Sequence, residues 1–499
     1  MRRLGLIAVA AALCLATACL FYRLVIHLPA AAAQTSSATA HLTPASVPNA
    51  ALPPGVSVEI TTVAPPGSSM YWAKRGDTIS SVAHHFLSRT SYLTSGELAE
   101  AIGKANGNPT GPYLKTGQTV IVPGMLDAPI VEKTISVPRD FEVRAVYLTG
   151  LMAGSDHGVS IIRRWREAGG NAVVFDIKDS DGSVNIPFDH ALLGKHPTPI
   201  PDLPKFVRFL HSQNLHAIAR VAIFRDERLV LAHPELAVRS HKTGQCWREN
   251  GKLVWTDPSQ SKVQEYDIAL ARKAAESGVD EVQFDYVRFP AEGDQHDATF
   301  VFQADHPDWH RADVIADFLK KAYAELHPTG VLLSLDVFGV MAWQRPVDLS
   351  HTGQDIVKMA SYCDVLSPMI YPSHFFGMDG YPRPGDAPAH FIGESMDRFE
   401  LITKGSGVVI RPWLQAFHWR TRTYSPKYIE IQVQTAKSKG GIGFLFWNAA
   451  NDYSKPFVAM PEMRAAKGQY FRGDELPDAS RSSLATSAAP ASDKPPIDK

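Results

Sequence analysis

The chain has 499 residues, of which 36 are prolines, 45% are hydrophobic and 20% are charged. This length exceeds what one hydrophobic core usually spans, so we expect two or more domains, and the composition excludes a disordered or fibrous protein. Fifty Lys and Arg residues against 51 Asp and Glu residues give a net charge of −1. Such a balance provides no positive field to hold a nucleic-acid backbone, which excludes nucleic acid as a partner.

The N-terminus has the features of an export signal. Arg2 and Arg3 precede an apolar run over residues 4–22, and a small-residue stretch follows up to Ala33. The run is about as long as a minimal membrane-spanning helix, so a cleaved signal peptide and an uncleaved membrane anchor are both consistent with it. We predict that residues 1–33 are the signal or anchor and that the remainder is extracytoplasmic, in the periplasm, in the cell wall or secreted.

Two segments without core-forming patterns flank the folded part of the chain. Residues 34–69 are rich in Ala, Ser, Thr and Pro and predict a linker, and residues 473–499 predict a disordered tail. Between them lie two foldable segments, 70–124 and 137–468. Beyond the signal region the chain has two cysteines, Cys246 and Cys363, which either pair in an oxidising compartment or act as small buried hydrophobic residues.

The segment 70–124 predicts a small α+β domain. A short strand near residue 71 leads to Gly76-Asp77-Thr78, which predicts a turn and a helix N-cap. A second helix over 97–105 ends near Asn106, and a closing strand covers 120–123. The order Gly-Asp-Thr-Ile, Ala-x-x-Phe, Asn and Leu-Lys-x-Gly-Gln-x-Val-x-Val-Pro resembles a LysM domain.

The LysM resemblance implies binding of N-acetylglucosamine-containing glycans such as peptidoglycan and chitin. It places Gly76, Asp77, Thr78 and Asn106 in the glycan-binding groove. The alternative is that Gly76 and Asn106 are turn residues and that Thr78 is an ordinary helix cap.

The segment 137–468 alternates short β-branched or aromatic runs with amphipathic helical patterns. Alternation of this kind predicts a parallel sheet, and eight repeats favour a closed (β/α)8 TIM barrel over an open, doubly wound sheet. No phosphate-binding glycine motif opens any of the helices, and we predict no cofactor. The eight expected strands cover residues 144–149, 172–177, 216–224, 281–289, 331–338, 365–371, 408–414 and 443–447.

Two aspartates near the ends of neighbouring expected strands are the candidate catalytic residues. Asp285 lies between Phe284 and Tyr286, so alternation turns its carboxylate away from these rings and toward the barrel mouth, and Asp336 has the same setting one strand later. Glycoside hydrolysis uses such a pair, with one carboxyl group as nucleophile or base and the other as acid. The alternative is a salt bridge at the barrel mouth, to Arg220 or Arg288 for example.

Other polar and aromatic side chains at the expected strand ends are candidates for substrate binding. Charged residues inside apolar strands are costly unless they are paired or used, and aromatic rings provide platforms for pyranose rings. Asp176 and Lys178 share a face and either bind sugar hydroxyls or form an internal ion pair. The histidines lack a second ligand at metal spacing, so we predict no metal site. The remaining candidates are Arg220, Arg288, Tyr371, His374, Trp413, Trp447, Trp255 and Asn448.

Several phrases of the long segment together resemble the glycoside hydrolase domain family of bacterial envelope proteins. These include Asn171 to Asp179, Ala219 to Asp226, Asp280 to Pro290 and Ser367 to His374. The resemblance implies a TIM barrel related to α-amylase-like glycosidases, in which a strand-four aspartate is commonly the nucleophile, and this role falls on Asp285. We assign the role of general acid to Asp336 on the fifth strand, because the sixth strand has Tyr371 but no carboxylate.

The sequence therefore predicts an exported glycoside hydrolase whose LysM module targets it to a cell-wall or extracellular polysaccharide. Two other interpretations stay open at this point. One is a non-catalytic envelope protein that binds glycan on a barrel scaffold, and the other is transglycosylation on the same carboxylates. The sugar, the linkage and the choice between retention and inversion do not follow from the sequence.

Overall fold

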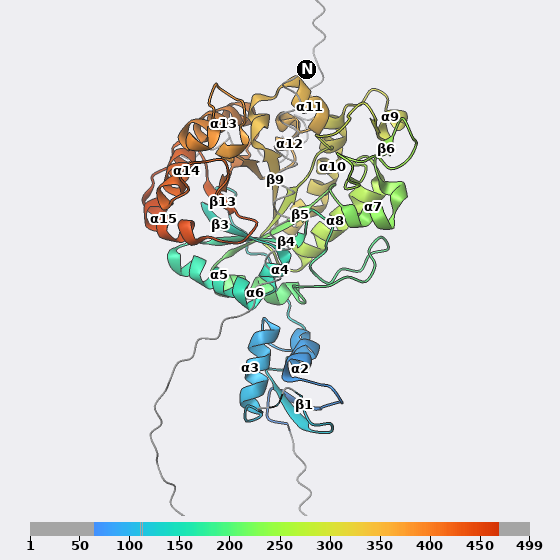
Figure 1. Cartoon of the computed structure of the whole chain (residues 1–499), viewed down its shortest axis with the longest axis vertical. Helices are drawn as coiled ribbons and strands as arrows, with labels where there is room; N and C mark the ends of the chain where they lie inside the picture. The colour runs from blue at the N-terminus through green and yellow to red at the C-terminus, as the bar shows by residue number, and fades with distance from the viewer. Residues whose placement is uncertain (1–63, 110, 112, 469–499) are drawn as a thin grey trace, which may run out of the picture.

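The computed structural model describes residues 64–109, 111 and 113–468, which form a small domain and a large barrel (Figure 1). The predicted signal or anchor, most of the first linker and the predicted tail lie outside these residues. Within the part of the chain that is described, no helix combines the length and the apolar character needed to cross a membrane.

The small domain is an antiparallel pair of strands covered by two helices. Strands β1 (Ser68–Trp72) and β2 (Thr119–Pro123) pair from Ser68↔Pro123 to Trp72↔Thr119. Helix α2 (Ile79–Phe86) begins at a capping box of Thr78 and Ser81, and α3 (Ser95–Ala105) follows a short turn, η2 (Leu87–Arg89). The helices and strands predicted for this segment are therefore present, around a core that includes Phe86, Leu98 and Ile102.

Eight parallel strands close the second domain into a barrel, which confirms the predicted (β/α)8 fold. Each strand pairs with the next, β10 pairs with β9, and β13 pairs with β3 to complete the ring. The seventh strand of the ring is divided into two short strands, β11 and β12. The strands are β3 (Val143–Leu148), β4 (Ala172–Lys178), β5 (His216–Ala222), β7 (Glu281–Asp285), β9 (Leu332–Phe338), β10 (Val365–Met369), β11 with β12 (Val409–Ile410 and Trp413–Gln415) and β13 (Gly443–Trp447).

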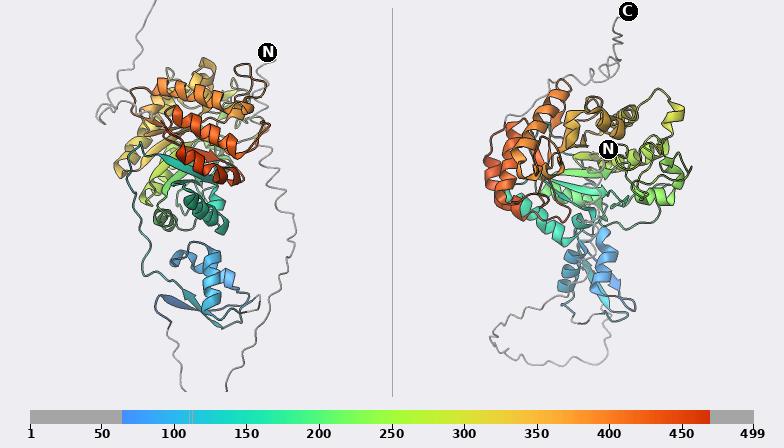
Figure 2. Two further views of the ribbon diagram at one scale, coloured as in Figure 1. Left: turned by 90° about the vertical axis from the view of Figure 1, so that its left-hand side faces the viewer. Right: turned by 45° about the horizontal axis from the view of Figure 1, so that its top comes forward.

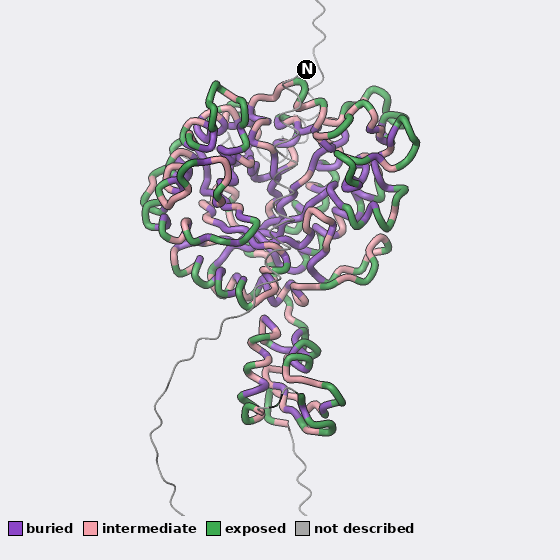
Figure 3. The backbone as a smooth tube through the Cα atoms, viewed as in Figure 1, coloured by how far each residue is buried: buried purple, intermediate pink, exposed green. Residues whose placement is uncertain are grey.

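Helices surround the ring of strands, and the buried residues concentrate between the two layers (Figure 3). Aliphatic and aromatic side chains on the outward face of each strand pack against the helices, as expected for a parallel barrel. Five of the helices match amphipathic patterns of the sequence closely, those over residues 159–168, 204–213, 263–277, 314–327 and 427–439. The outer helices are α5 (Asp156–Ala168), α6 (Leu203–Ser212), α8 (Ser261–Glu276), α10 (Arg311–Leu326), α12 (Ile356–Ala360), α13 (Pro388–Thr403), α14 (Pro426–Ser438) and α15 (Ser454–Ala465).

Two expected strands differ from prediction for identifiable backbone reasons. The fourth, expected over residues 281–289, ends at Asp285 because Tyr286 adopts a left-handed conformation with φ of 54°. The seventh, expected over residues 408–414, is interrupted between β11 and β12, where Pro412 has no N–H to donate to a neighbouring strand. The amphipathic pattern over residues 353–363 predicts a longer helix than the one observed, α12, which Asp355 caps.

The small domain docks on the outer helices α5 and α6 (Figures 1 and 2). Lys205 of α6 is buried and donates to the backbone oxygens of Leu87, at 2.7 Å, and Tyr92, at 3.2 Å. Thr94, the cap of α3, bonds to Asp156 at the start of α5. The two domains are therefore joined by specific polar contacts as well as by the connecting segment.

Candidate active site

Three aspartates contact or approach one arginine inside the barrel, near the carboxyl ends of the strands. Arg220 of β5 forms ion pairs with Asp176 of β4 and Asp285 of β7, and its Nε lies 3.7 Å from Asp336 Oδ2 of β9. All four side chains are at least nine-tenths buried. The structure therefore brings together four of the residues that the sequence singled out, from four successive strands.

The strand register places the two candidate catalytic aspartates side by side. Strands β7 and β9 pair in parallel up to Phe284↔Leu335, so the next position on each strand is Asp285 beside Asp336. Neighbouring strands are about 4.8 Å apart, and residues at matching positions point to the same face of the sheet. Asp285 occupies the last position of its strand, where the Tyr286 N–H donates to its Oδ1 at 2.6 Å.

The excess of negative charge perturbs two of these carboxyl groups. Burial and the charge of Asp285 raise the pKa of Asp336 well above its ordinary value, against the opposing effect of Arg220. Burial also raises the pKa of Asp176, and the Tyr147 hydroxyl bonds to that carboxyl group. One guanidinium cannot compensate three buried carboxylates, so protons are retained in the cluster.

Two tryptophans predicted as sugar platforms are instead buried. The Trp413 Nε1–H donates to Asp336 Oδ1 at 2.7 Å, and the ring is only 2% exposed. Trp255, also 2% exposed, donates from its Nε1–H to Glu249 at 2.8 Å. The sequence pattern does not distinguish a buried aromatic residue from one that stacks on sugar, because both kinds of residue lie in or next to a strand. Trp413 is therefore a partner of Asp336 and not a surface for sugar.

A different group of aromatic residues forms a wall near Asp336 and Arg220. The Trp447 ring is partly exposed and lies 6.0 Å from that of Tyr371 and 5.3 Å from that of Phe417. The His374 ring is 5.4 Å from that of Tyr371, and this residue is exposed. Burial in the concave mouth and the nearby charge of Arg420 lower the pKa of His374 to about 4. Tyr371, Trp447 and His374 thus gather on one side of the barrel mouth.

Lys178 does not share a face with Asp176, which corrects the sequence-based prediction. The β4–β5 pairing has a register shift between these two residues, so Lys178 points out of the barrel. It is completely buried and pairs with Asp226 at 2.9 Å and with Asp267 of α8 at 2.7 Å. Lys178 is therefore engaged in internal ion pairs, although with Asp226 and Asp267 and not with Asp176, and it is not accessible to sugar.

Asn448 and Arg288 are also engaged within the protein. The Asn448 amide donates to Ala416 O and Asp452 O and accepts from the Ala450 N–H, so each polar atom of this side chain has an internal partner. This contradicts the prediction that Asn448 binds substrate. Arg288 is buried, with its guanidinium 4.4 Å from the Phe338 ring centre and 4.7 Å from that of Trp255. The arginine that pairs with Asp285 is Arg220.

The residues that the LysM resemblance singled out have structural partners in the small domain. Asp77 accepts from the Tyr71 hydroxyl at 2.6 Å and from a backbone N–H, and Thr78 caps α2. Asn106 bonds to the backbone of α3 and of β2, and Gly76 has a φ of 91°. Their positions are those of turn, cap and strand-joining residues, and their contact with glycan stays a prediction.

A second buried ion cluster lies near the starts of the strands. Arg411 donates to both oxygens of Glu281, at 2.8 and 2.9 Å, and His216 lies 3.1 Å from the same carboxyl group. Burial by itself would raise the pKa of Glu281, but Arg411 and His216 lower it to about 2. This cluster is fully enclosed and joins three strands of the barrel.

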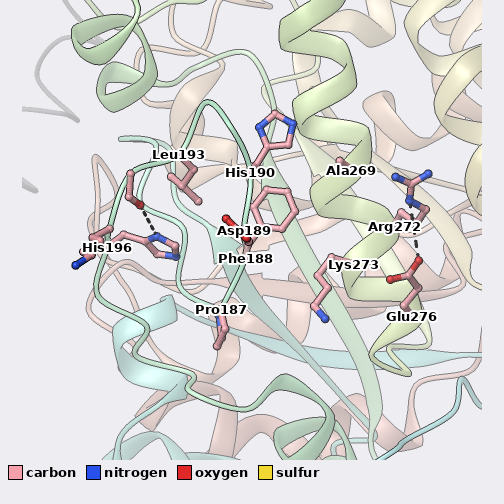
Figure 4. A pocket seen from close by; sticks show the side chains of 12 residues that line it. Pro187, Phe188, Asp189, His190, Leu193, His196, Ala269, Arg272, Lys273 and Glu276 are labelled. Carbon is pink, nitrogen blue, oxygen red and sulfur yellow. Dashed lines mark hydrogen bonds and ion pairs between the residues drawn. The ribbon is translucent and has the colours of Figure 1, made fainter.

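A groove of about 1140 Å³ lies on the outer side of the barrel, between residues 187–196 and helix α8 (Figure 4). Its acidic side chains, Asp189 and Glu276, are on the surface, and Glu276 lies 4.0 Å from Arg272. It contains no converging buried carboxylates. The candidate active site is therefore the aspartate cluster within the barrel.

Sequence reasoning did not single out Tyr147 or Phe417 as residues of the site. Alternation along the first strand turns Val143, Ala145 and Tyr147 inward, which could have placed the Tyr147 hydroxyl near the Asp176 carboxylate. Phe417 lies outside any regular pattern. Cys246 and Cys363 are both free, and Cys363 is buried.

The closed barrel with a buried aspartate cluster at the ends of its strands defines a barrel of the glycosidase class. The family described as "Putative glycosyl hydrolase domain" matches residues 145–453, more than half of the chain, and the protein belongs to that family. It is accordingly a glycosidase, a hydrolase that acts on glycans. No functionally curated protein matches the chain.

Solved structures similar to this chain include three from bacteria. A hypothetical protein from Ruminiclostridium thermocellum is 35% identical over 38% of this chain and 97% of its own, with a TM-score of 0.35. The glycoside hydrolase domain of PgaB (BpsB) from Bordetella bronchiseptica is 15% identical over 65% and 97% of the two chains, with a TM-score of 0.48. The spore cortex-lytic enzyme SleL from Bacillus megaterium is 13% identical over 81% and 87%, with a TM-score of 0.40.

Proposed function

We propose that this glycosidase is exported and cleaves a cell-wall or extracellular polysaccharide by means of Asp285 and Asp336. The observation that carries the proposal is the sharing of one guanidinium, that of Arg220, by three buried aspartates. Asp285 lies at the strand end, has a direct ion pair with Arg220 and has the most exposed carboxyl group of the three, at 10%. Asp336 is the neighbour that retains a proton, because burial and Asp285 raise its pKa.

These differences assign opposite roles to the two carboxyl groups. The Asp285 carboxylate attacks the anomeric carbon while the bond to the leaving oxygen breaks, and the proton of Asp336 passes to that oxygen. In the second step the Asp336 carboxylate takes a proton from water, whose oxygen displaces Asp285 and releases the sugar. Arg220 forms an ion pair with Asp285 and positions its carboxylate, and the rings of Trp447 and Tyr371 offer apolar contact to the substrate.

The spacing of the two aspartates favours retention of anomeric configuration. Matching positions on neighbouring parallel strands are about 4.8 Å apart. Retaining glycosidases have carboxyl groups about 5–5.5 Å apart, whereas inverting enzymes need about 6.5 Å or more to admit a water molecule. The adjacent register of Asp285 and Asp336 supports the closer arrangement. Proton NMR of the first product formed would give the anomer directly.

We also propose that the small domain targets the barrel to a glycan that contains N-acetylglucosamine, in the manner of a LysM module. The support is the motif order together with the β-α-α-β arrangement of the folded segment. Residues 4–22 would export the chain and, if uncleaved, hold it at the membrane. Tethering the barrel near its substrate raises the local concentration of cleavable bonds. Loss of residues 64–125 should therefore reduce release from insoluble wall material more than release from soluble oligosaccharides.

The test is reducing-end release from a panel of wall glycans and exopolysaccharides by the wild type and by Asp285→Asn. The amide keeps the size of the side chain but cannot form the glycosyl ester, so turnover should fall by about 10³-fold or more. A matched control is Asp189→Asn, which changes a surface aspartate in the outer groove. Wild-type turnover in Asp285→Asn would overturn the assignment, and binding without release by the wild type would indicate a non-catalytic glycan-binding barrel.

A further inference from the structure

A pocket of about 330 Å³ opens beside the aromatic wall of the barrel mouth. It lies between the segment that follows β10, the turn η7 (Pro384–Asp386) and the loop after β12. Arg383 and Arg420 line it together with Phe376 and neutral residues, and no acidic side chain is among its lining residues. Within the described part of the chain, neither arginine has a carboxylate within ion-pair distance.

The backbone around Arg420 is fixed by several contacts. Arg420 has a φ of 46°, and a Cβ on Gly385 would lie 2.5 Å from its carbonyl oxygen, so only glycine permits this close approach. Asp386 accepts from the Arg422 N–H at 2.7 Å and from the Thr421 hydroxyl at 3.1 Å. These contacts hold the loop against η7, and the Asp386 carboxylate also lies 3.5 Å from Arg422 Nε.

The same loop is joined to the active-site side of the barrel. Gln415 of β12 accepts from the Ser373 N–H at 3.3 Å and donates to the Trp419 carbonyl at 3.3 Å, so one side chain connects both walls of the pocket. Ser373 lines the pocket and lies 3.2 Å from His374 Nδ1, whose ring neighbours Tyr371. The pocket therefore borders the segment that carries two residues of the wall proposed to contact sugar, Tyr371 and His374.

The Arg420 guanidinium lies 4.7 Å from the Phe376 ring centre, and the Phe376 side chain is 39% exposed. An arginine stacked on a ring keeps its N–H groups free to point sideways, where they form short, charge-assisted bonds to a carboxylate. Arg383 is exposed at the opposite side of the pocket. Two cations, one apolar ring and no competing anion form a complementary site for a negatively charged sugar.

We propose that this pocket is a specificity subsite that binds a carboxylate carried by the glycan, through Arg383 and Arg420. The inference rests on the proposed function, and it makes the substrate class an acidic polysaccharide. The carboxylate could belong to a uronic acid or to the lactyl ether of a muramic acid residue. Both present the same planar anion, and the arms of the experiment distinguish them.

The test is affinity electrophoresis of the full chain carrying Asp285→Asn, which removes hydrolysis and leaves the pocket intact. The gels contain polygalacturonate, alginate, hyaluronan or peptide-free peptidoglycan strands, each in its native and its carboxyl-reduced form. We expect at least one native polymer to bind about tenfold more tightly than its reduced form, with the difference falling as salt rises. Retardation in a polyuronate identifies a uronic acid, and retardation only in peptidoglycan strands identifies the lactyl group.

The variants Arg383→Gln and Arg383→Gln/Arg420→Gln should abolish this preference, while Arg272→Gln on the outer surface of α8 should retain it. Because Arg383 is exposed, its single variant folds even if the double variant does not. Equal retardation by native and reduced polymers, retardation insensitive to the pocket variants, or no retardation in any gel would overturn the subsite. Reducing-end release by the wild type is scored separately, so a binding result with no release overturns the hydrolase mechanism and not the subsite.

Discussion

The barrel contains two buried arginine clusters that look alike in composition and differ in charge balance. Near the strand starts, Arg411 faces one carboxylate, Glu281, whose pKa it lowers to about 2 with the help of His216. Near the strand ends, Arg220 faces three aspartates, and the pKa values of Asp176 and Asp336 are raised by burial.

The difference separates a charge-balanced ion pair from the unbalanced cluster to which we assign the chemistry in the proposed mechanism. A balanced buried pair has little tendency to exchange protons, because both partners are already in their charged forms. An unbalanced cluster retains a proton close to an ionised carboxylate, which is the condition for an acid beside a nucleophile. Position follows the same division, since barrel enzymes place their chemistry at the carboxyl ends of the strands.

Breaking the balanced cluster should have the largest effect on stability. Glu281→Gln leaves the Arg411 charge buried without a counter-ion, so the free energy of unfolding should fall by about 3–5 kcal/mol in urea denaturation. Glu100→Gln is the surface control, because its pair with Lys104 is 68% exposed on both sides and solvent screens the interaction, so we expect a far smaller change. Equal changes for the two variants would contradict the proposed structural role of Glu281.

The same cluster should make stability depend on pH. The folded pKa of Glu281 is about 2, below its ordinary value of 4.5, so its contribution to stability is complete above pH 4.5. That contribution is lost as the pH falls from about 4.5 toward 2, because the unfolded chain binds the proton first. Glu281→Gln should therefore flatten this part of the curve of unfolding free energy against pH, and an unchanged slope would exclude Glu281 as its source.

Asp336→Asn should sharpen the functional side of the comparison. Removing a general acid costs about 10²–10⁴-fold in rate on the natural glycan, but much less on a dinitrophenyl glycoside, whose leaving group needs no proton. Asp336 must be protonated to act, so wild-type activity should fall as the pH rises through its pKa, and the variant should lack this alkaline limb. If the variant lost the same factor in rate on both substrates, Asp336 would be a positioning residue and not the general acid.

Trp413→Phe is the matched variant, because it removes the N–H that donates to Asp336 and keeps a smaller aromatic ring in its place. That hydrogen bond lowers the pKa of Asp336, so its loss should move the alkaline limb to higher pH. A profile of kcat against pH for the wild type and the variant gives the direction of the shift. A shift to lower pH, or none, would mean that Trp413 does not control the Asp336 proton.

The smallest effect is expected for Asp176→Asn. Because the pKa of Asp176 is raised, its protonated form is favoured, and asparagine resembles that form in shape and charge. The free energy of unfolding should change by about 1 kcal/mol or less, although the substitution is chemically the same as Glu281→Gln. A loss as large as that of Glu281→Gln would show that Asp176 is held ionised and would remove the contrast between the clusters.

Most of the barrel could be predicted from the sequence, because each strand is a short apolar run and each helix has its own period and caps. Asp285 and Asp336 could be placed in the same way, since both lie on apolar strands that a parallel barrel brings together. The strand boundaries that were predicted wrongly depend on the backbone of single residues. Tyr286 ends β7 through its left-handed conformation, and Pro412 interrupts the seventh strand.

The sequence by itself determined the class of fold, the neighbouring strand positions of Asp285 and Asp336 and the family to which the barrel belongs, because these depend on local periodicity and on short motifs. The tertiary structure decided which side chains are partners. The register shift in β4 turns Lys178 outward, and Trp413 is buried against Asp336. The Asn448 amide forms its hydrogen bonds within the loops. The tertiary structure also assembled the Arg383 and Arg420 pocket from loops that are far apart in the chain. Contacts between distant segments depend on how strands and loops pack in three dimensions, and local sequence patterns do not specify that packing.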